Sequence, residues 1–300
     1  PANFTKLYYV DAARPDDTGN GLTPATAKKT IWAAIYAVVR NGMEYVILVA
    51  PGTYTDNDMN FGGRSIKLRS TGGAGQTIIN CGSRSALAFT TSEGPECWLD
   101  GFTVRNGYVF GTGQFDQGGI IYVYNASPQI KNCIIEDNYA YTSRMPSGTL
   151  ALINSSSTIS NCKFARNTGG RSVYSENGAN VFENCEFMEN SAGAVSAAGG
   201  TGITFKVCSF RNNYTSGNAS GGAVSINSVP ASFQRCEFRS NSANSQGGAI
   251  YISSGSWHTT VLENCLLIGN SASNYGAIST SDYASLVIRN STLAFNRPSA

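Results

Sequence analysis

Eight cysteines are the side chains of this sequence best suited to metal binding or covalent cross-linking. Structural zinc sites use closely paired spacings such as Cys-x-x-Cys, and the sequence contains none. Evenly spaced thiols instead fit equivalent positions of a repeat, where reduced and buried cysteines act as small hydrophobic side chains. Cys81 and Cys97 lie outside this series and could form one disulfide. The six cysteines of the series recur every 23 to 29 residues, at Cys133, Cys162, Cys185, Cys208, Cys236 and Cys265.

Oxygen ligands for a cation occur together in one polar stretch near the N-terminus. Asp11, Asp16, Asp17 and Asn20 could bind calcium, which takes several oxygen ligands. The spacing is not that of an EF-hand or of an RTX nonapeptide, and the same residue types also make ordinary turns. Calcium is the only cofactor that the sequence suggests.

The remaining charged side chains do not form a catalytic pattern. Lys163 and Glu186 occupy the same position in neighbouring repeats, which predicts an ordinary surface pair rather than a converging set of acids. His258, the single histidine, follows a tryptophan in a polar stretch. We therefore predict no catalytic residue, which favours a non-enzymatic protein over an enzyme.

Aromatic residues gather in the variable stretches between repeats and are the candidates for ligand contact. These stretches are expected to be loops outside the repeated core, where exposed rings could bind a glycan or a protein surface. Their alternative role is that of solvated connectors. The candidate ligand-binding residues are Tyr108, Phe110, Phe115, Tyr139, Tyr141 and Tyr214.

A seven-residue motif, Asn-Cys-x-Phe-x-x-Asn, repeats through the second half of the chain. It is clearest as NCKFARN (161–167) and NCEFMEN (184–190), and a second motif, as in GGAV (221–224) and GGAI (247–250), lies between its copies. Within the heptad, Cys and Phe are two residues apart and a polar residue separates them, which is the period of a β-strand. The Phe and the closing Asn of successive repeats should form buried columns, with the Asn at a turn where a left-handed backbone is tolerated.

Repeats of this length, without helical periodicity, predict an all-β fold: a right-handed parallel β-helix with three strands per coil. We predict that residues 1–62 form an N-terminal cap. It consists of a strand, a polar loop, a capping α-helix that begins at Thr23-Pro24 and a first strand. Residues 63–300 read as the β-helix, which we expect to continue beyond Ala300.

Composition excludes several classes of protein. Charged residues make up 13% of the sequence and the net charge is +2. This is not the strongly basic composition expected of a nucleic-acid-binding protein. No apolar run reaches the roughly 18 residues that a membrane span needs. A weakly charged, strand-rich chain is therefore expected.

Two related groups of proteins resemble this sequence. The stretch from YYVDAARPDDTGNG to VILVAPGTYT (8–55) is similar to the N-terminal part of bacterial pectin-lyase-like, right-handed β-helix surface proteins. The Phe-x-x-Asn and Gly-Gly-Ala-Ile motifs resemble the repeats of chlamydial polymorphic outer membrane proteins. These resemblances imply a secreted or cell-surface location and an adhesive role, in contact with a glycan, a cell-surface protein or another copy of the chain.

The resemblance leaves two alternatives open. One is a polysaccharide lyase or hydrolase, although Asp16-Asp17 and His258 do not reproduce the Asn-Thr-Asp, Asp-Asp and Gly-His-Gly segments that characterise pectic hydrolases of this fold. The other is a subunit of a fibre in which solenoids stack end to end.

Overall fold

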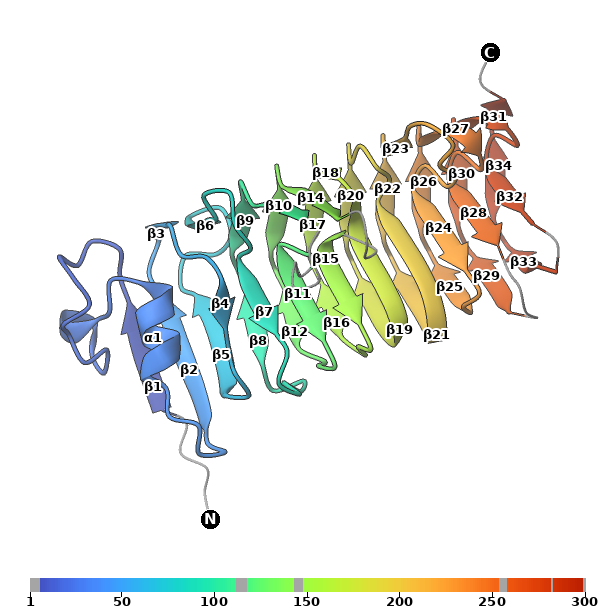
Figure 1. Cartoon of the computed structure of the whole chain (residues 1–300). Helices are drawn as coiled ribbons and strands as arrows, with labels where there is room; N and C mark the ends of the chain where they lie inside the picture. The colour runs from blue at the N-terminus through green and yellow to red at the C-terminus, as the bar shows by residue number, and fades with distance from the viewer. Residues whose placement is uncertain (1–5, 112–117, 143–147, 254–257, 282, 299–300) are drawn as a thin grey trace.

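The computed structural model describes residues 6–111, 118–142, 148–253, 258–281 and 283–298. Its strands wind along one axis into an elongated solenoid, with the N-terminal and C-terminal ends at opposite ends (Figure 1). Successive turns pair in parallel and in register, so that equivalent residues lie one above another. Among the described residues, no helix is long and apolar enough to cross a membrane.

The largest sheet has eighteen strands and receives two segments from most turns. Its strands are β1 (Lys6–Val10), β2 (Glu44–Val49), β4 (Met59–Asn60), β5 (Ser65–Ser70), β7 (Leu87–Phe89), β8 (Trp98–Asp100), β11 (Ile121–Tyr124), β12 (Gln129–Lys131), β15 (Gly148–Ile153), β16 (Thr158–Ser160), β19 (Arg171–Glu183), β21 (Val195–Lys206), β24 (Val224–Asn227), β25 (Ala231–Gln234), β28 (Ile250–Ser253), β29 (Thr259–Glu263), β32 (Ile278–Thr280) and β33 (Ser285–Arg289).

A ten-stranded sheet contains the strands of the heptads, and two short sheets lie at the following corner. The ten strands are β3 (Gly52–Tyr54), β6 (Thr77–Asn80), β9 (Thr103–Arg105), β13 (Ile134–Glu136), β17 (Lys163–Ala165), β20 (Glu186–Met188), β22 (Ser209–Arg211), β26 (Glu237–Arg239), β30 (Leu266–Ile268) and β34 (Thr292–Ala294). The short sheets are β10 (Tyr108–Gly111), β14 (Tyr139–Thr142) and β18 (Thr168–Gly169), and β23 (Tyr214–Thr215), β27 (Ser242–Gln246), β31 (Ser271–Asn274) and β35 (Arg297–Pro298).

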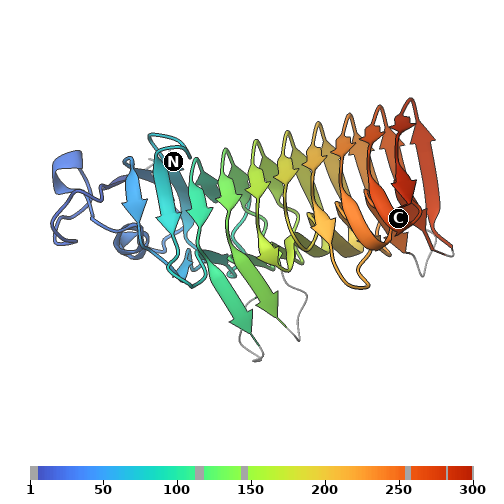
Figure 2. The same ribbon diagram turned by 90° about the horizontal axis from the view of Figure 1, so that it is seen from above.

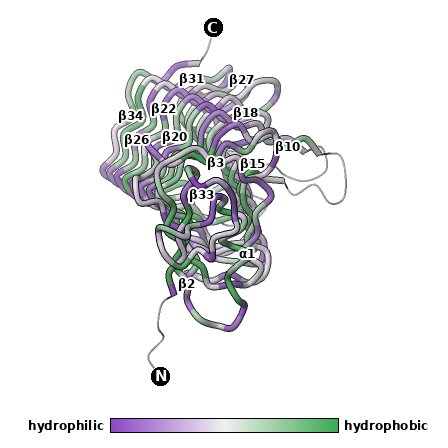
Figure 3. Tube along the Cα trace, turned by 90° about the vertical axis from the view of Figure 1, so that its left-hand side faces the viewer, coloured by the Kyte–Doolittle hydropathy of each residue, from purple (hydrophilic) through white to green (hydrophobic). Residues whose placement is uncertain are grey.

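One turn of the solenoid can be followed from β11 through β12 and β13 to β14. The first three are the strands that the motifs predict, and the fourth lies where the sequence predicts a loop. In two turns the first two strands are replaced by one long strand, β19 or β21. β19 pairs with both β15 and β16 of the preceding turn and with β21 of the next, so these long strands make the large sheet continuous. Seen along the axis, the turns lie behind one another, and β10 protrudes to one side (Figure 3).

The N-terminal helix α1 (Ile31–Ala37) packs against β1, β2 and β4. Its residues Ile31, Ala34 and Ile35 are buried in the same core as the strands. Thr23-Pro24 does not begin this helix: it opens a separate 3-10 helix, η1 (Pro24–Thr26), whereas the Thr30 side chain caps α1. The strands β1 and β2 were expected within a cap, but β1 pairs with β2, and β2 pairs with β5 of the large sheet. The division at residue 62 and the capping role of the helix stay predictions.

Stacked phenyl rings fill the interior, as the heptads predict. Phe164, Phe187, Phe210 and Phe238 are fully buried, and their neighbouring ring centroids lie 4.6–5.0 Å apart. A second stack, Phe182, Phe205 and Phe233, runs beside it with spacings of 5.1 and 4.9 Å. Burial of one such side chain stabilises the fold by roughly 1.5–3 kcal/mol, so these stacks are a main source of stability.

The closing asparagines form a continuous, buried hydrogen-bond ladder. The Oδ1 atom of Asn190 accepts from the backbone N and the Nδ2 of Asn167, at 3.0 and 3.2 Å. The Nδ2 of Asn190 donates to Phe164 O at 3.1 Å and to Asn213 Oδ1 at 2.8 Å. Each amide therefore satisfies both its own turn and the next, as a coil-to-coil ladder requires.

The left-handed residues of the turns are not these asparagines. The residue before each closing Asn has positive φ, as in Arg166 (51°) and Glu189 (57°), and so has the first Asn of the heptad, as in Asn184 (52°). The closing Asn keeps an ordinary backbone because its side chain must point inward into the ladder. In the Gly-Gly motif, Gly247 has a φ of 62°, while a Cβ on Gly248 would lie 2.3 Å from Ser271 O.

Candidate functional site

Two strands that extend from one corner of the solenoid carry four aromatic side chains. β10 and β14 project away from the body of the molecule, as the two long green arrows in Figure 2 show. They pair in parallel, with Tyr108 opposite Tyr139 and Phe110 opposite Tyr141. We call these four residues the aromatic shelf. Because alternate residues of a strand point to the same face, two in-register strands place the four rings on one surface.

The rings of the aromatic shelf stack along the solenoid axis. The centroids of Tyr108 and Tyr139 are 4.8 Å apart with an angle of 14° between the planes, and those of Phe110 and Tyr141 are 5.8 Å apart with an angle of 23°. Tyr108 and Phe110 remain 48% and 55% exposed, and Tyr141 remains 40% exposed. A group of exposed aromatic rings on a folded protein marks an interaction surface.

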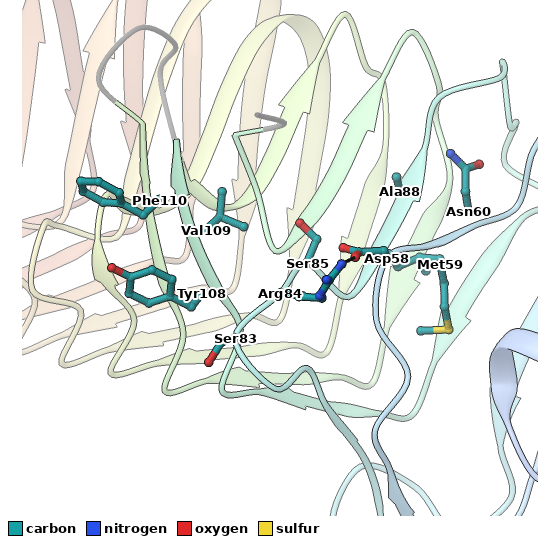
Figure 4. Close-up of a pocket in the computed structure, with 11 residues that line it drawn as sticks. Asp58, Met59, Asn60, Ser83, Arg84, Ser85, Ala88, Tyr108, Val109 and Phe110 are labelled. Atoms are coloured by element: carbon teal, nitrogen blue, oxygen red, sulfur yellow. Dashed lines mark hydrogen bonds and ion pairs between the residues drawn. The ribbon is translucent and has the colours of Figure 1, made fainter. Parts of the chain in front are cut away.

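A cavity of about 460 Å³ lies next to the shelf. Tyr108, Val109 and Phe110 lie on one side of it, and the ion pair of Asp58 and Arg84 lies on the other (Figure 4). Its volume falls in the range of small-molecule sites, roughly 300–1,000 Å³. Its described lining residues are Asp58, Met59, Asn60, Ser83, Arg84, Ser85, Leu87, Ala88, Tyr108, Val109 and Phe110.

A backbone hydrogen bond and a side-chain ion pair between two turns hold the polar side of the cavity in place. The N–H of Asp58 donates to Ser85 O at 2.8 Å, and Arg84 Nη1 donates to Asp58 Oδ2 at 2.7 Å. Asp58 and Ser83 both have left-handed backbones, with φ of 48° and 70°. Such conformations are costly for residues other than glycine and persist where the surrounding structure fixes them, often at binding sites.

The structure brings together four of the six predicted ligand-binding residues. Tyr108, Phe110, Tyr139 and Tyr141 form the shelf, and the stretches expected to be loops there begin as strands. Tyr214 lies in β23 of a different short sheet and is exposed, away from the shelf. Phe115 lies outside the described residues.

The polar side of the cavity, formed by Asp58 and Arg84, was not predicted from the sequence. Asp58 and Arg84 belong to no motif, but they are 26 residues apart, which is the length of one turn. A search for opposite charges separated by one repeat length could have found this pair.

The four predicted calcium ligands are each engaged locally. Asp17 accepts from the backbone N of Lys29 and Thr30 at 2.7 and 2.9 Å. Asp16 accepts from Thr18, Asp11 from Ala13 N and Asn20 from Leu22 N, which are turn contacts. Over the described ranges of the chain, no three His, Cys, Asp or Glu side chains are placed to hold a metal ion. Calcium binding by Asp11, Asp16, Asp17 and Asn20 stays a prediction that this geometry does not favour.

Cys81 and Cys97 do not form the disulfide that the sequence allows. Both thiols are free and buried, because Cys81 directly follows β6 of the ten-stranded sheet whereas Cys97 directly precedes β8 of the large sheet. Their Sγ atoms contact different carbonyls, Ile79 O at 3.9 Å and Arg64 O at 3.4 Å. Burial raises the pKa of each thiol to about 12. The six cysteines of the repeat are also free and buried, as predicted.

Trp98 is an aromatic residue whose ring is already occupied. Lys131 Nζ lies 3.2 Å and Lys67 Nζ 4.4 Å from the centroid of the ring, in cation–π contacts. Lys67 also forms an ion pair with Glu44 at 2.7 Å. Since these contacts cover the indole, Trp98 is less suited to ligand contact than the shelf.

Comparison with known proteins agrees with this architecture. The family model described as a right handed beta helix region matches residues 52–238. A solved pectate lyase, Pel9A, superposes with a TM-score of 0.56 at 15% identity, over 97% of this chain and 79% of that one. A pectin methylesterase in complex with a hexasaccharide superposes with a TM-score of 0.52 at 12% identity, over 99% of this chain and 94% of that one. At these identities the likeness shows the fold alone. No curated protein sequence matches the chain significantly.

Proposed function

The chain belongs to the right-handed β-helix family, and from that premise we propose that it is an extracellular glycan-binding module rather than an enzyme. The binding surface in this proposal is the aromatic shelf with its adjoining cavity. One observation carries it: Tyr108 and Phe110, both with exposed side chains, line the same cavity as the Asp58–Arg84 ion pair. Sugars have apolar ring faces and hydroxyl groups at their edges, so they match a site with aromatic rings on one side and polar groups on the other.

Rigid support favours binding through the shelf. Tyr139 and Tyr141 stack on Tyr108 and Phe110 and restrict their motion. A side chain that is ordered before the ligand arrives loses less conformational entropy when it binds. The rigid solenoid beneath therefore presents a largely pre-formed surface.

Electrophoresis through gels that contain soluble polysaccharides tests this function. The wild-type chain should be retarded by at least one polysaccharide, and Tyr108→Ala with Phe110→Ala should abolish the retardation. Tyr214→Ala is the matched control, because Tyr214 is 46% exposed, close to the 48% of Tyr108, but lies in another sheet. Retardation by no polysaccharide, or retardation that survives the double substitution, would overturn the proposal.

A polysaccharide lyase or hydrolase is the second candidate. The solved structures with the same fold include a pectate lyase and a pectin methylesterase. Most glycoside hydrolases use two carboxyl groups on either side of the scissile bond, whereas Asp58 is the one carboxylate among the described lining residues of this cavity. Cleavage products from the retained polysaccharide, lost in Asp58→Asn, would replace binding by catalysis as the function.

Secretion, display at a cell surface and self-contact complete the proposal. Their support is the resemblance of the repeats to those of surface proteins. End-to-end stacking into a fibre stays a prediction, which electron microscopy of the purified chain would test.

A further inference from the structure

We infer that the cavity beside the aromatic shelf selects a neutral glycan over one made of uronic acids. This inference rests on the proposed function and specifies the chemical class of its ligand. Two features of the cavity support it: the balance of its charge and the hydrogen-bonding capacity of its ion pair. The spacing of the rings indicates the direction in which the glycan lies.

The charges of the cavity cancel. Of the lining residues that the structure describes, only Asp58 and Arg84 are charged, and they form an ion pair with an N–O distance of 2.7 Å. Because Asp58 already neutralises the guanidinium of Arg84, the cavity offers no free positive charge to a sugar carboxylate. A uronate would bring its own negative charge next to Asp58 and gain no free positive charge to compensate it.

The hydrogen-bonding capacity of the pair favours hydroxyl groups. An ionised carboxylate such as Asp58 only accepts hydrogen bonds, and a guanidinium such as Arg84 only donates them. A hydroxyl does both, so two adjacent sugar hydroxyls can donate to Asp58 and accept from Arg84. A uronate carboxylate only accepts, so it can pair with Arg84 but cannot donate to Asp58 as a hydroxyl does. The two side chains are 48% and 66% exposed, so both are accessible to a ligand.

The rings fix the direction of the glycan. Tyr108 and Phe110 lie on one strand with centroids 6.5 Å apart, so one extended glycan can reach both rings. Tyr139 and Tyr141 stack on them from the next turn and do not line the cavity. Two consecutive sugar units can therefore contact Tyr108 and Phe110, so that the glycan runs along β10 and across the solenoid axis.

Calorimetric titration with oligosaccharides of equal length tests the inference. The probes are hexasaccharides of β-1,4-linked glucose, mannose and xylose, and a hexasaccharide of galacturonic acid. The wild-type chain should bind one of the neutral probes at least about tenfold more tightly than the uronate, a difference of about 1.4 kcal/mol. Its affinity should also change little with salt concentration, because no net charge is neutralised.

Two substitutions distinguish a site that selects its ligand through the Asp58–Arg84 pair from one that binds through apolar contacts alone. Asp58→Asn removes the carboxylate and frees the positive charge of Arg84, so binding of the uronate should rise and binding of the neutral probe should fall. Arg84→Gln should weaken the neutral probe without strengthening the uronate. An exposed ion pair contributes little to the stability of a fold, so both variants should fold, which circular dichroism checks.

Each outcome supports or overturns one of the two proposals. Tighter binding of the uronate by the wild type, or an unchanged preference in Asp58→Asn, would overturn the inference while Tyr108-dependent glycan binding still supports the proposed function. If none of the four probes binds and the gels show no retardation, both proposals fail. Neutral binding that survives Tyr108→Ala would place the ligand elsewhere and would overturn the inference.

Discussion

The ring of Tyr139 stacks on that of Tyr108, one turn earlier, with a centroid distance of 4.8 Å and an angle of 14°. Tyr108 lines the cavity and Tyr139 does not. In the proposed site Tyr139 is therefore a positioning residue, which would act on a bound glycan through the ring of Tyr108.

Loss of that support should weaken binding without removing a ligand contact. Tyr139→Ala should lower the affinity for the retained glycan about two- to tenfold, since an aromatic pair contributes roughly 0.5–1.5 kcal/mol beyond burial. Tyr139→Phe keeps the stacked ring and should bind like the wild type. Titration calorimetry measures both, and the Ala variant should show a larger entropic penalty. Equal losses in the two variants would instead assign a direct role to the hydroxyl group.

The amide ladder should dominate the stability of the corner. Asn190→Ala removes the acceptor of Asn167 and the donor to Phe164 O, and leaves both groups buried. Each unsatisfied group costs about 1–3 kcal/mol, so urea denaturation should show a loss of at least about 2 kcal/mol. Asn227→Ala, at an exposed position, should change the free energy of unfolding by less than about 0.5 kcal/mol. Similar losses for both variants would contradict a special role for the ladder.

Close backbone packing makes one glycine of the Gly-Gly motif irreplaceable. A Cβ on Gly248 would lie 2.3 Å from Ser271 O and 2.5 Å from Gly276 O, and both are backbone atoms that cannot move independently. Gly248→Ala should therefore destabilise the chain by several kcal/mol or prevent folding. Gly75→Ala, where nothing lies within 4 Å, is the control and should unfold at the wild-type urea concentration. A Gly248→Ala variant of wild-type stability would show that this backbone approach is wrong.

Two buried thiols should make the fold sensitive to alkali. Burial raises the pKa of Cys81 and Cys97 to about 12 from a usual value of 9.0. In the unfolded chain these thiols ionise near pH 9, whereas in the folded chain they stay protonated. Their contribution to the free energy of unfolding is therefore complete below pH 9 and falls as the pH rises toward 12. At pH 10 the loss should be about 1 kcal/mol for each thiol.

Urea denaturation at pH 8 and pH 10 measures this effect. The decrease in stability should be smaller in Cys81→Ala and Cys97→Ala than in the wild type, and other titrating groups cancel in that comparison. In the folded wild type, alkylating reagents at pH 8 should modify neither thiol. Rapid modification of Cys97 without denaturant would contradict its burial.

Period and residue type were sufficient to predict the buried columns. Phe164 and Phe187 fall two residues after an in-register cysteine, and a strand places both on the inner face, which the structure confirms. The second stack, which includes Phe182 and Phe205, lies three residues before the heptad cysteines, where the sequence favoured a further strand but no stacked column of rings was predicted. The left-handed φ was assigned to the wrong residue of the turn, since the sequence alone does not show that Asn190 needs its side chain inside.

The candidate site was predictable only in part. Exposed aromatic residues after a repeat suggested contact, but the pairing of β10 with β14 depends on the register of two turns. The Asp58–Arg84 pair depends on the same register and on two left-handed residues outside any motif. Local patterns thus predicted the candidates, whereas their assembly into a cavity is a tertiary effect.

Phe187 and Phe210 are paired in register on neighbouring turns, and their ring centroids lie 4.8 Å apart. Neighbouring turns therefore have nearly the same surroundings. A segment such as residues 185–207 is thus an interchangeable module, bounded at both ends by the same cysteine position. Duplication of one whole module would lengthen the molecule without requiring new core contacts. Gain or loss of whole modules in the gene would change the distance between the aromatic shelf and the C-terminal end. The residues of the shelf would stay the same.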